Sequence, residues 1–184
     1  MDDALRQLRD IIRQKSLRIG EFTLSSGKRS SYYLDCRMTT LDPTGALLIG
    51  RLMLDCIRKH NIQADAIGGL TIGADPIATA VAVVSALEGQ PLPAFIVRKE
   101  TKGHGTQRLI EGYDGKPGSR VIVVDDVCTT GDSILKAADR AEETGYEVVA
   151  AFCVVDREGG GAELIAKRYP FYALFTAKEL LKDA

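Results

Sequence analysis

A continuous run of β-branched residues at positions 121–124 constrains the fold of this chain more than any other stretch. Such a run suits a strand that is covered on both faces, which is the usual situation in the middle of a parallel sheet. Two carboxylates, Asp125 and Asp126, follow the run, and a periodic segment at positions 134–144 then ends at Gly145. The order predicts a central strand, a functional loop and a helix.

The loop between that strand and that helix has the composition of a sugar-phosphate site. In open α/β sheets, ligands lie beyond the carboxyl ends of the strands, and backbone N–H groups at a helix N-terminus favour a phosphate. Carboxylates only accept hydrogen bonds, so the acidic pair could hold two sugar hydroxyls. The candidate phosphate-binding residues are Thr129, Thr130, Gly131, Asp132 and Ser133. The alternative is that Asp132 or Ser133 only caps the helix and that the acidic pair only solvates a strand end.

Residues 120–134 closely resemble the signature of the type I phosphoribosyltransferases, which bind phosphoribosyl pyrophosphate. The resemblance implies that Asp125 and Asp126 contact the ribose hydroxyls and that the loop after them wraps the 5′-phosphate. Strands that alternate with helices along the chain also predict a three-layer α/β/α domain with a mainly parallel sheet. We therefore expect the type I phosphoribosyltransferase fold, with an N-terminal hood that contains a hairpin.

Two alternating segments, 19–24 and 31–37, predict an antiparallel hairpin after an amphipathic helix at 2–15. The hairpin could be an addition without a role in binding. It resembles the N-terminal segment of the orotate phosphoribosyltransferases, where a hood covers the pyrimidine. The matching residues are Phe22, Leu24, Ser26, Gly27, Ser30, Tyr32, Asp35 and Arg37. The resemblance implies substrate contacts from Ser25, Tyr32 and Tyr33, although some orotate enzymes carry a pyrophosphate-binding lysine where this chain has Ser25.

A second unit of strand, loop and helix follows a helix that starts at Asp42. Its strand is predicted at 65–70, and its small loop contains Thr71 and Gly73. The resemblance assigns this loop to the pyrophosphate, and an ordinary tight turn is the alternative. Asp75 is expected to cap the next helix. Some family members place a lysine in this loop, and this chain has none there.

A strongly basic stretch follows the strand predicted at 94–97. It contains Arg98, Lys99, Lys102 and His104, and its glycines and lack of apolar anchors predict a mobile surface loop. A solvated polar loop without a function is the alternative. The order of residues matches the catalytic loop of the orotate family, which closes over the active site of the neighbouring subunit. The resemblance therefore implies a homodimer with shared active sites, and it makes Lys102 and His104 catalytic together with the acidic pair.

The last third of the chain continues the alternation of strands and helices. We predict a short edge strand at 108–112, a buried strand at 146–155, a helix at 162–169 and a last strand at 171–175. Arg157 follows the buried strand, and the resemblance places it on the carboxylate of orotate. A plain salt bridge is the alternative.

Composition limits the other classes of function. The 24 basic and 25 acidic residues nearly balance, so no global positive field indicates a nucleic-acid-binding protein. No apolar run approaches the roughly 20 residues that span a bilayer, and the N-terminus lacks the apolar core of a signal peptide. The four cysteines form no C-x-x-C pair, which indicates neither a zinc site nor a disulfide framework. We expect one cytoplasmic domain over residues 1–184, with a hood formed mainly by 1–40.

The reaction implied by the resemblance joins orotate to phosphoribosyl pyrophosphate and gives orotidine 5′-monophosphate and pyrophosphate, a step of de novo pyrimidine biosynthesis. A magnesium ion is expected mainly on the substrate diphosphate and water, without a metal site on the protein. Two alternatives remain open. One is a purine or uracil phosphoribosyltransferase, and the other is a regulator that binds phosphoribosyl pyrophosphate without catalysis.

Overall fold

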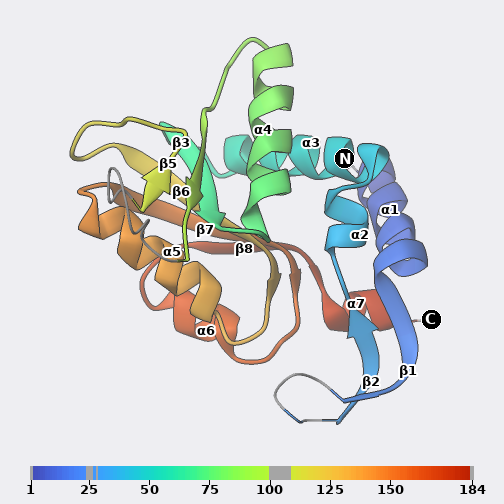
Figure 1. Cartoon of the computed structure of the whole chain (residues 1–184). Coiled ribbons are helices and arrows are strands. Elements are labelled where there is room, and N and C mark those ends of the chain that lie inside the picture. Colours follow the sequence, from blue (N-terminus) through green and yellow to red (C-terminus); the bar gives the residue numbers. More distant parts are fainter. Residues whose placement is uncertain (1, 24–26, 28, 100–108, 183–184) are drawn as a thin grey trace.

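The structure is a computed structural model and describes residues 2–23, 27, 29–99 and 109–182. In this part of the chain the main sheet has six strands in the order β5-β4-β3-β6-β7-β8 (Figure 1). They are β3 (Ala66–Leu70), β4 (Ala94–Val97), β5 (Ile110–Glu111), β6 (Arg120–Cys128), β7 (Glu147–Asp156) and β8 (Phe171–Thr176). All neighbours are parallel except β4 and β5. The predictions of a mainly parallel sheet and a short edge strand are confirmed.

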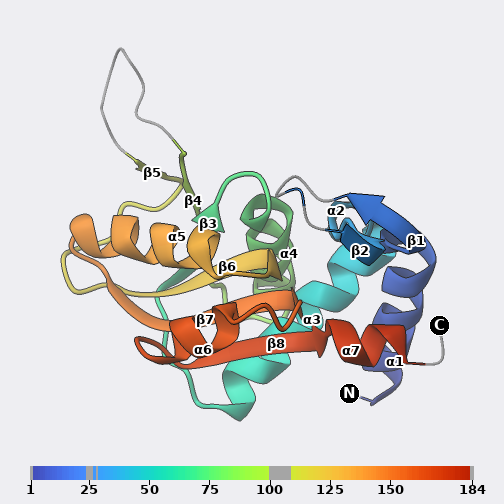
Figure 2. The ribbon, with the colours of Figure 1, turned by 90° about the horizontal axis from the view of Figure 1, so that it is seen from below.

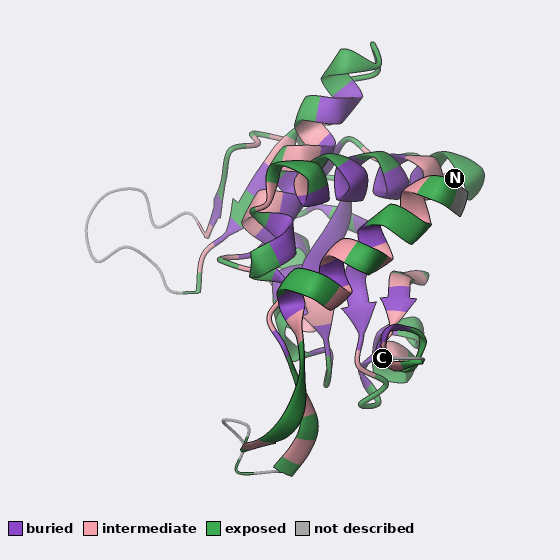
Figure 3. Ribbon diagram, turned by 90° about the vertical axis from the view of Figure 1, so that its right-hand side faces the viewer, coloured by how far each residue is buried: buried purple, intermediate pink, exposed green. Residues whose placement is uncertain are grey.

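Helices cover both faces of this sheet and complete three layers (Figure 1). One face carries α3 (Pro43–Lys59) and α4 (Ala74–Leu87), and the other carries α5 (Asp132–Glu143) and α6 (Gly161–Ala166). Along β6, Ile122 and Val124 pack into the core on the α3–α4 side, whereas Val121 and Val123 pack into the core on the α5–α6 side. All four are fully buried, and Figure 3 shows the central strands buried as a group. The prediction of a central strand covered on both faces is confirmed.

The N-terminal segment forms a separate antiparallel hairpin at the end of α1, outside the main sheet (Figure 2). Its elements are α1 (Asp2–Ile11), the π-helical turn η1 (Ile12–Ser16), β1 (Leu17–Thr23) and β2 (Arg29–Leu34). Leu8 and Ile12 are fully buried, so they anchor this segment to the core. The predicted helix and hairpin are confirmed, with the last turn of the helix in π form.

Local sequence signals set the ends of the outer helices. Asp42 caps α3, because its Oδ1 accepts hydrogen bonds from the backbone N–H groups of Thr44 and Gly45 at 3.1 and 3.0 Å. The short helix α2 (Arg37–Thr40) joins the hairpin to α3. The chain closes with α7 (Ala177–Leu181), which begins with a capping box between Thr176 and Glu179.

The central strand is longer than the sequence predicts. It continues past Val124 to Cys128, and its ladder with β7 includes Asp125 opposite Cys153. Asp125 and Asp126 therefore lie within the strand, not in a loop after it. The apolar run ends at residue 124, but backbone pairing with β7 continues and keeps the acidic pair extended.

Within the described ranges, none of the helices is both long enough and apolar enough to span a bilayer.

Candidate active site

A polar cavity of about 290 Å³ lies at the carboxyl ends of β3 and β6. We call it the acidic cavity, and its lining consists of Tyr33, Leu34, Asp35, Cys36, Arg37, Leu70, Thr71, Ile72, Gly73, Lys99, Asp125, Asp126, Val127 and Ser133. The fold thus brings together candidate residues from the hairpin, both predicted loops and the start of the basic stretch. Ligands of open α/β sheets bind at this edge of the sheet.

The acidic pair is held at the base of this site by the backbone of β6. The N–H of Asp126 donates to Oδ1 of Asp125 at 3.0 Å, and the N–H of Val127 donates to Oδ1 of Asp126 at 2.8 Å. Burial and the neighbouring charge of Asp126 raise the pKa of Asp125 to about 7. Burial also raises the pKa of Asp126. A cationic ligand or a developing positive charge would therefore favour the ionised pair.

The loop after β3 approaches the acidic pair closely. A Cβ atom on Gly73 would lie 2.3 Å from Oδ1 of Asp125 and 2.9 Å from Oδ1 of Asp126. Only glycine leaves the carboxylates in place at this position. The loop is therefore fitted to the acidic pair, which the alternative of an ordinary tight turn does not require.

The prediction that Asp75 caps α4 is wrong. The N-cap is Gly73, with no side-chain hydrogen bond, and Asp75 lies inside the first turn. Its Oδ2 accepts a hydrogen bond from Oγ1 of Thr71 at 2.7 Å. Gly73 already has helical backbone angles and the helix begins at Ala74, two residues earlier than a capping Asp75 would require.

The loop after β6 presents polar side chains at the start of α5. Gly131 is its N-cap, with the left-handed φ of 84° that glycine adopts without strain. Oγ1 of Thr130 donates to Oδ2 of Asp132 at 2.9 Å. Thr129 and Ser133 are exposed beside them. No side chain caps α5, so the alternative that Asp132 or Ser133 serves as its cap is wrong.

Arg157 connects the end of β7 to the hairpin. Its Nε donates to the hydroxyl of Tyr32 at 3.2 Å, and its guanidinium carbon lies 4.8 Å from the centre of the Tyr32 ring. The described residues place no carboxylate within ion-pairing distance of Arg157, which does not support a plain salt bridge. Both residues line a cavity of about 550 Å³ that also reaches Glu158 and Lys178.

The basic stretch is described only at its start. Lys99 lines the acidic cavity, whereas Nη1 of Arg98 forms an ion pair with Oε1 of Glu111 at 2.9 Å. The structure therefore does not bring Arg98 into the cavity. Lys102, His104 and Ser25 lie outside the described residues.

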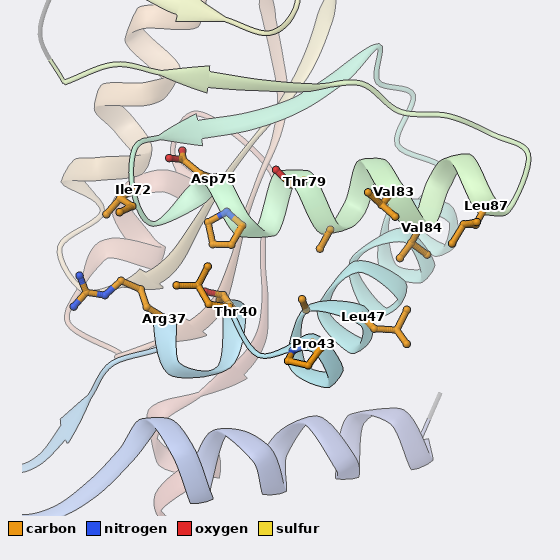
Figure 4. Close-up of a pocket in the computed structure, with 14 residues that line it drawn as sticks. Arg37, Thr40, Pro43, Leu47, Ile72, Asp75, Thr79, Val83, Val84 and Leu87 are labelled. Atoms are coloured by element: carbon orange, nitrogen blue, oxygen red, sulfur yellow. The ribbon is translucent and has the colours of Figure 1, made fainter.

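Two features were missed by reasoning from the sequence. Asp35 and Arg37 line the acidic cavity, although they entered the sequence analysis only as part of a pattern. The second feature is an apolar groove of about 580 Å³ between α3 and α4 (Figure 4). This α3–α4 groove is lined by Arg37, Thr40, Leu41, Pro43, Ala46, Leu47, Ile72, Asp75, Pro76, Thr79, Ala80, Val83, Val84 and Leu87. The broad apolar face of α3 was the available signal.

This fold and cavity are those of a known class. The model of the family described as "Phosphoribosyl transferase domain" matches residues 40–180, which include the main sheet and both loops of the site. That match covers well over half of the 184 residues.

Individual relatives narrow the class. The orotate phosphoribosyltransferase of Aquifex aeolicus is 50% identical over 179 residues, covering 95% of this chain and 96% of the relative. A crystal structure of the Mycobacterium tuberculosis orotate phosphoribosyltransferase with Fe(III) dicitrate superposes with a TM-score of 0.86 at 41% identity, covering 97% of this chain and 99% of that chain. The complex of the M. tuberculosis enzyme with 5-phospho-alpha-D-ribosyl 1-diphosphate gives 0.79 at 37% identity, covering 96% and 98%. The chain therefore belongs to the orotate phosphoribosyltransferases, a branch of the phosphoribosyltransferase family.

Proposed function

We propose that this protein transfers the phosphoribosyl group of phosphoribosyl pyrophosphate to orotate, in the synthesis of pyrimidine nucleotides. The observation that carries the proposal is the fit between the Gly73 loop and the buried pair Asp125 and Asp126, two elements that a sugar diphosphate needs side by side. Two relatives that bear the name of this enzyme match the chain over 96% and 84% of their own length.

The acidic pair binds the two ribose hydroxyls and faces the reacting carbon. The ring nitrogen of orotate attacks that carbon, and the bond to the diphosphate oxygen breaks. Positive charge grows on the ribose during this step, which favours ionisation of carboxyls whose pKa burial has raised. The protein supplies orientation and electrostatic stabilisation, and no side chain forms a covalent bond.

The remaining contacts divide among the three parts of the substrates. The loop at 129–133 wraps the 5′-phosphate, since its hydroxyls and the start of α5 face outward at this edge. The diphosphate lies along the loop of Thr71 and Gly73, opposite the side chains of the basic stretch: Arg98, Lys99, Lys102 and His104. Of these, Lys102 and His104 act on the departing diphosphate. Orotate lies under the hood at Ser25, Tyr32 and Tyr33, with its carboxylate on Arg157.

Magnesium accompanies the diphosphate in this proposal. Magnesium usually keeps several waters and binds substrate phosphates with one or two protein carboxylates, so the proposed ion is held mainly by the diphosphate and water. The hard oxygens of Asp125 and Asp126 suit such an ion as outer ligands. When bound, it would neutralise part of the charge of the diphosphate.

The α3–α4 groove is proposed as the seat of a second copy of the chain. Leu41, Ile72, Val83 and Leu87 expose between 55% and 79% of their surface there, which is unusual for neighbouring large apolar residues. The groove adjoins the acidic cavity through Arg37 and Ile72, which line both. In this proposal the partner seated here contributes its basic stretch to the neighbouring site. The product is a homodimer with shared active sites.

The organisation of the chain follows from the same proposal. Residues 1–184 form one catalytic domain, in which 1–40 make the hood over orotate. The cytoplasm is the proposed location, and four free cysteines fit a reducing compartment.

A substrate panel tests the proposed function. The protein is incubated with magnesium, phosphoribosyl pyrophosphate and one base at a time: orotate, uracil, adenine or hypoxanthine. We expect consumption of orotate alone, with equimolar pyrophosphate released. Consumption of another base identifies a different transferase, and binding of phosphoribosyl pyrophosphate without turnover of any base indicates a regulator.

A further inference from the structure

The acidic cavity is short of positive charge for the ligand that it is proposed to bind. Its described lining contains three carboxylates, those of Asp35, Asp125 and Asp126, against the cations of Arg37 and Lys99. Neither position 25 nor the loop at 71–75 supplies a lysine. A diphosphate adds several negative charges, so a cation on the cavity wall has a large electrostatic effect.

Arg37 is fixed in this wall by a forked ion pair. Its Nε donates to Oδ1 of Asp35 at 2.8 Å, and its Nη2 donates to Oδ2 at 3.0 Å. The backbone N–H of Arg37 donates to the same carboxylate at 3.1 Å. These contacts use two of the five guanidinium N–H groups, and the other three make no hydrogen bond within the described part of the chain. Asp35 therefore orients the guanidinium of Arg37 and leaves three of its N–H groups available to a ligand.

The Arg37 side chain lines the same cavity as the loop proposed for the diphosphate, residues 71–73. Figure 4 shows Arg37 on the same side of the pocket as Ile72, the residue between Thr71 and Gly73, and both residues line the acidic cavity. The side chain is 48% exposed, so a ligand can reach it. Burial raises the pKa of Asp126, and the charge of Arg37 acts in the opposite direction, which places the guanidinium within electrostatic range of the acidic pair.

We propose that Arg37 binds the diphosphate of phosphoribosyl pyrophosphate directly and that Asp35 is the positioning residue that aims it. A planar guanidinium matches two phosphate oxygens at once, and an ion pair that is already formed reduces the entropy lost on binding. The inference rests on the proposed function, since it names a further residue of the same site.

The test compares two ligands that share the site but not the diphosphate. Inorganic pyrophosphate and orotidine 5′-monophosphate are each titrated calorimetrically, in magnesium buffer, into wild type, Arg37→Ala, Arg37→Lys and Asp35→Asn. Arg140→Ala is the control, because it removes an arginine from another surface ion pair, that with Glu143. We expect Arg37→Ala to weaken pyrophosphate about 10- to 100-fold, as for a lost charged hydrogen bond. Orotidine 5′-monophosphate should change less than about twofold on the same reasoning.

The other variants sharpen the result. Arg37→Lys should keep part of the pyrophosphate affinity, Asp35→Asn should lose about threefold to tenfold, and Arg140→Ala should match wild type. Unchanged pyrophosphate affinity in Arg37→Ala, or equal weakening of both ligands, overturns the proposal. If Arg37→Ala does not fold, wild-type affinity in both Arg37→Lys and Asp35→Asn overturns it. A wild type that makes no orotidine 5′-monophosphate from its two substrates contradicts the proposed function instead, whatever Arg37 binds.

Discussion

Two neighbouring hollows of this molecule differ in almost every physical property. The acidic cavity measures about 290 Å³ and contains buried carboxylates, whereas the α3–α4 groove measures about 580 Å³ and is lined mostly by apolar side chains. They meet at Arg37 and Ile72. The larger hollow has no cluster of groups that could carry chemistry, and the smaller one has too little apolar surface to hold a protein partner. Under the proposed function, the acidic cavity carries the chemistry and the α3–α4 groove carries the contact with a second subunit.

Removal of both carboxylates gives the largest effect that the contrast predicts. In Asp125→Asn with Asp126→Asn, kcat/KM should fall at least about 10³-fold, because the groups that face the growing positive charge are gone. The fold should persist, since asparagine has the same shape. Steady-state kinetics with circular dichroism measure both quantities. Near-normal activity in a folded double variant would contradict a catalytic role for the acidic cavity.

Substitution of Arg157 should affect the binding of one substrate and not the other. Arg157→Ala should raise the KM for orotate about 10- to 100-fold and leave the KM for phosphoribosyl pyrophosphate within about threefold, because only orotate loses a charged hydrogen bond. Initial rates with each substrate varied in turn give both constants. Equal changes in the two constants would contradict a carboxylate contact and favour a structural role through Tyr32.

A charged residue introduced into the α3–α4 groove should weaken the dimer and should not act directly on the groups of the acidic cavity. Val83→Glu places a carboxylate on an exposed apolar residue of α4, and it should weaken the dimer by about 2 kcal/mol. Leu164→Glu on α6 is the matched control, since that leucine is also exposed but lies on the opposite helical layer. Light scattering across a dilution series measures the effect. If both variants dissociate equally, or if neither dissociates more than wild type, the proposal that a second subunit binds in the groove is contradicted.

The smallest predicted effect is on stability. The pKa of Asp125 is raised from 3.8 to about 7, so the folded protein retains a proton that the unfolded chain releases. The stability associated with that proton is complete below about pH 4 and is lost as the pH rises through about 7. Asp125→Asn should therefore match wild type near pH 4 and exceed it by about 1 to 2 kcal/mol at pH 8. Urea unfolding at both pH values measures the difference in free energy of unfolding between the variant and wild type. A variant less stable than wild type at pH 8 would contradict the predicted direction.

The sequence predicted the acidic cavity far better than the groove. A run of β-branched residues that ends in two carboxylates predicts a central strand with a polar site at its end, and the family resemblance added the loop of Gly73 as part of that site. The length of β6 escaped prediction because backbone pairing with β7 continues past the last apolar residue. The apolar periodicity of α3 marks which side chains avoid water, but it does not say which of them the chain itself leaves uncovered.

The two residues between the hollows show the same limit. Arg37 stood in a recognised pattern without a role, because only the folded chain reveals that Asp35 holds it beside the loop of Ile72. Asp75 was predicted as a cap from its place before a helix. The helix instead starts at Ala74, and the carboxylate of Asp75 accepts a hydrogen bond from Thr71. Spacing along the chain identifies candidates, and backbone geometry decides between them.

Subunit mixing tests most directly whether the two hollows serve one shared site. Lys102→Ala and Asp125→Asn are each prepared as inactive proteins and mixed in equal amounts under conditions that exchange subunits. If the basic stretch of one subunit serves the acidic cavity of the other, half of the dimers are mixed and each has one intact site, so about a quarter of wild-type activity should return. No recovery, with exchange demonstrated by labelled subunits, would contradict a shared site.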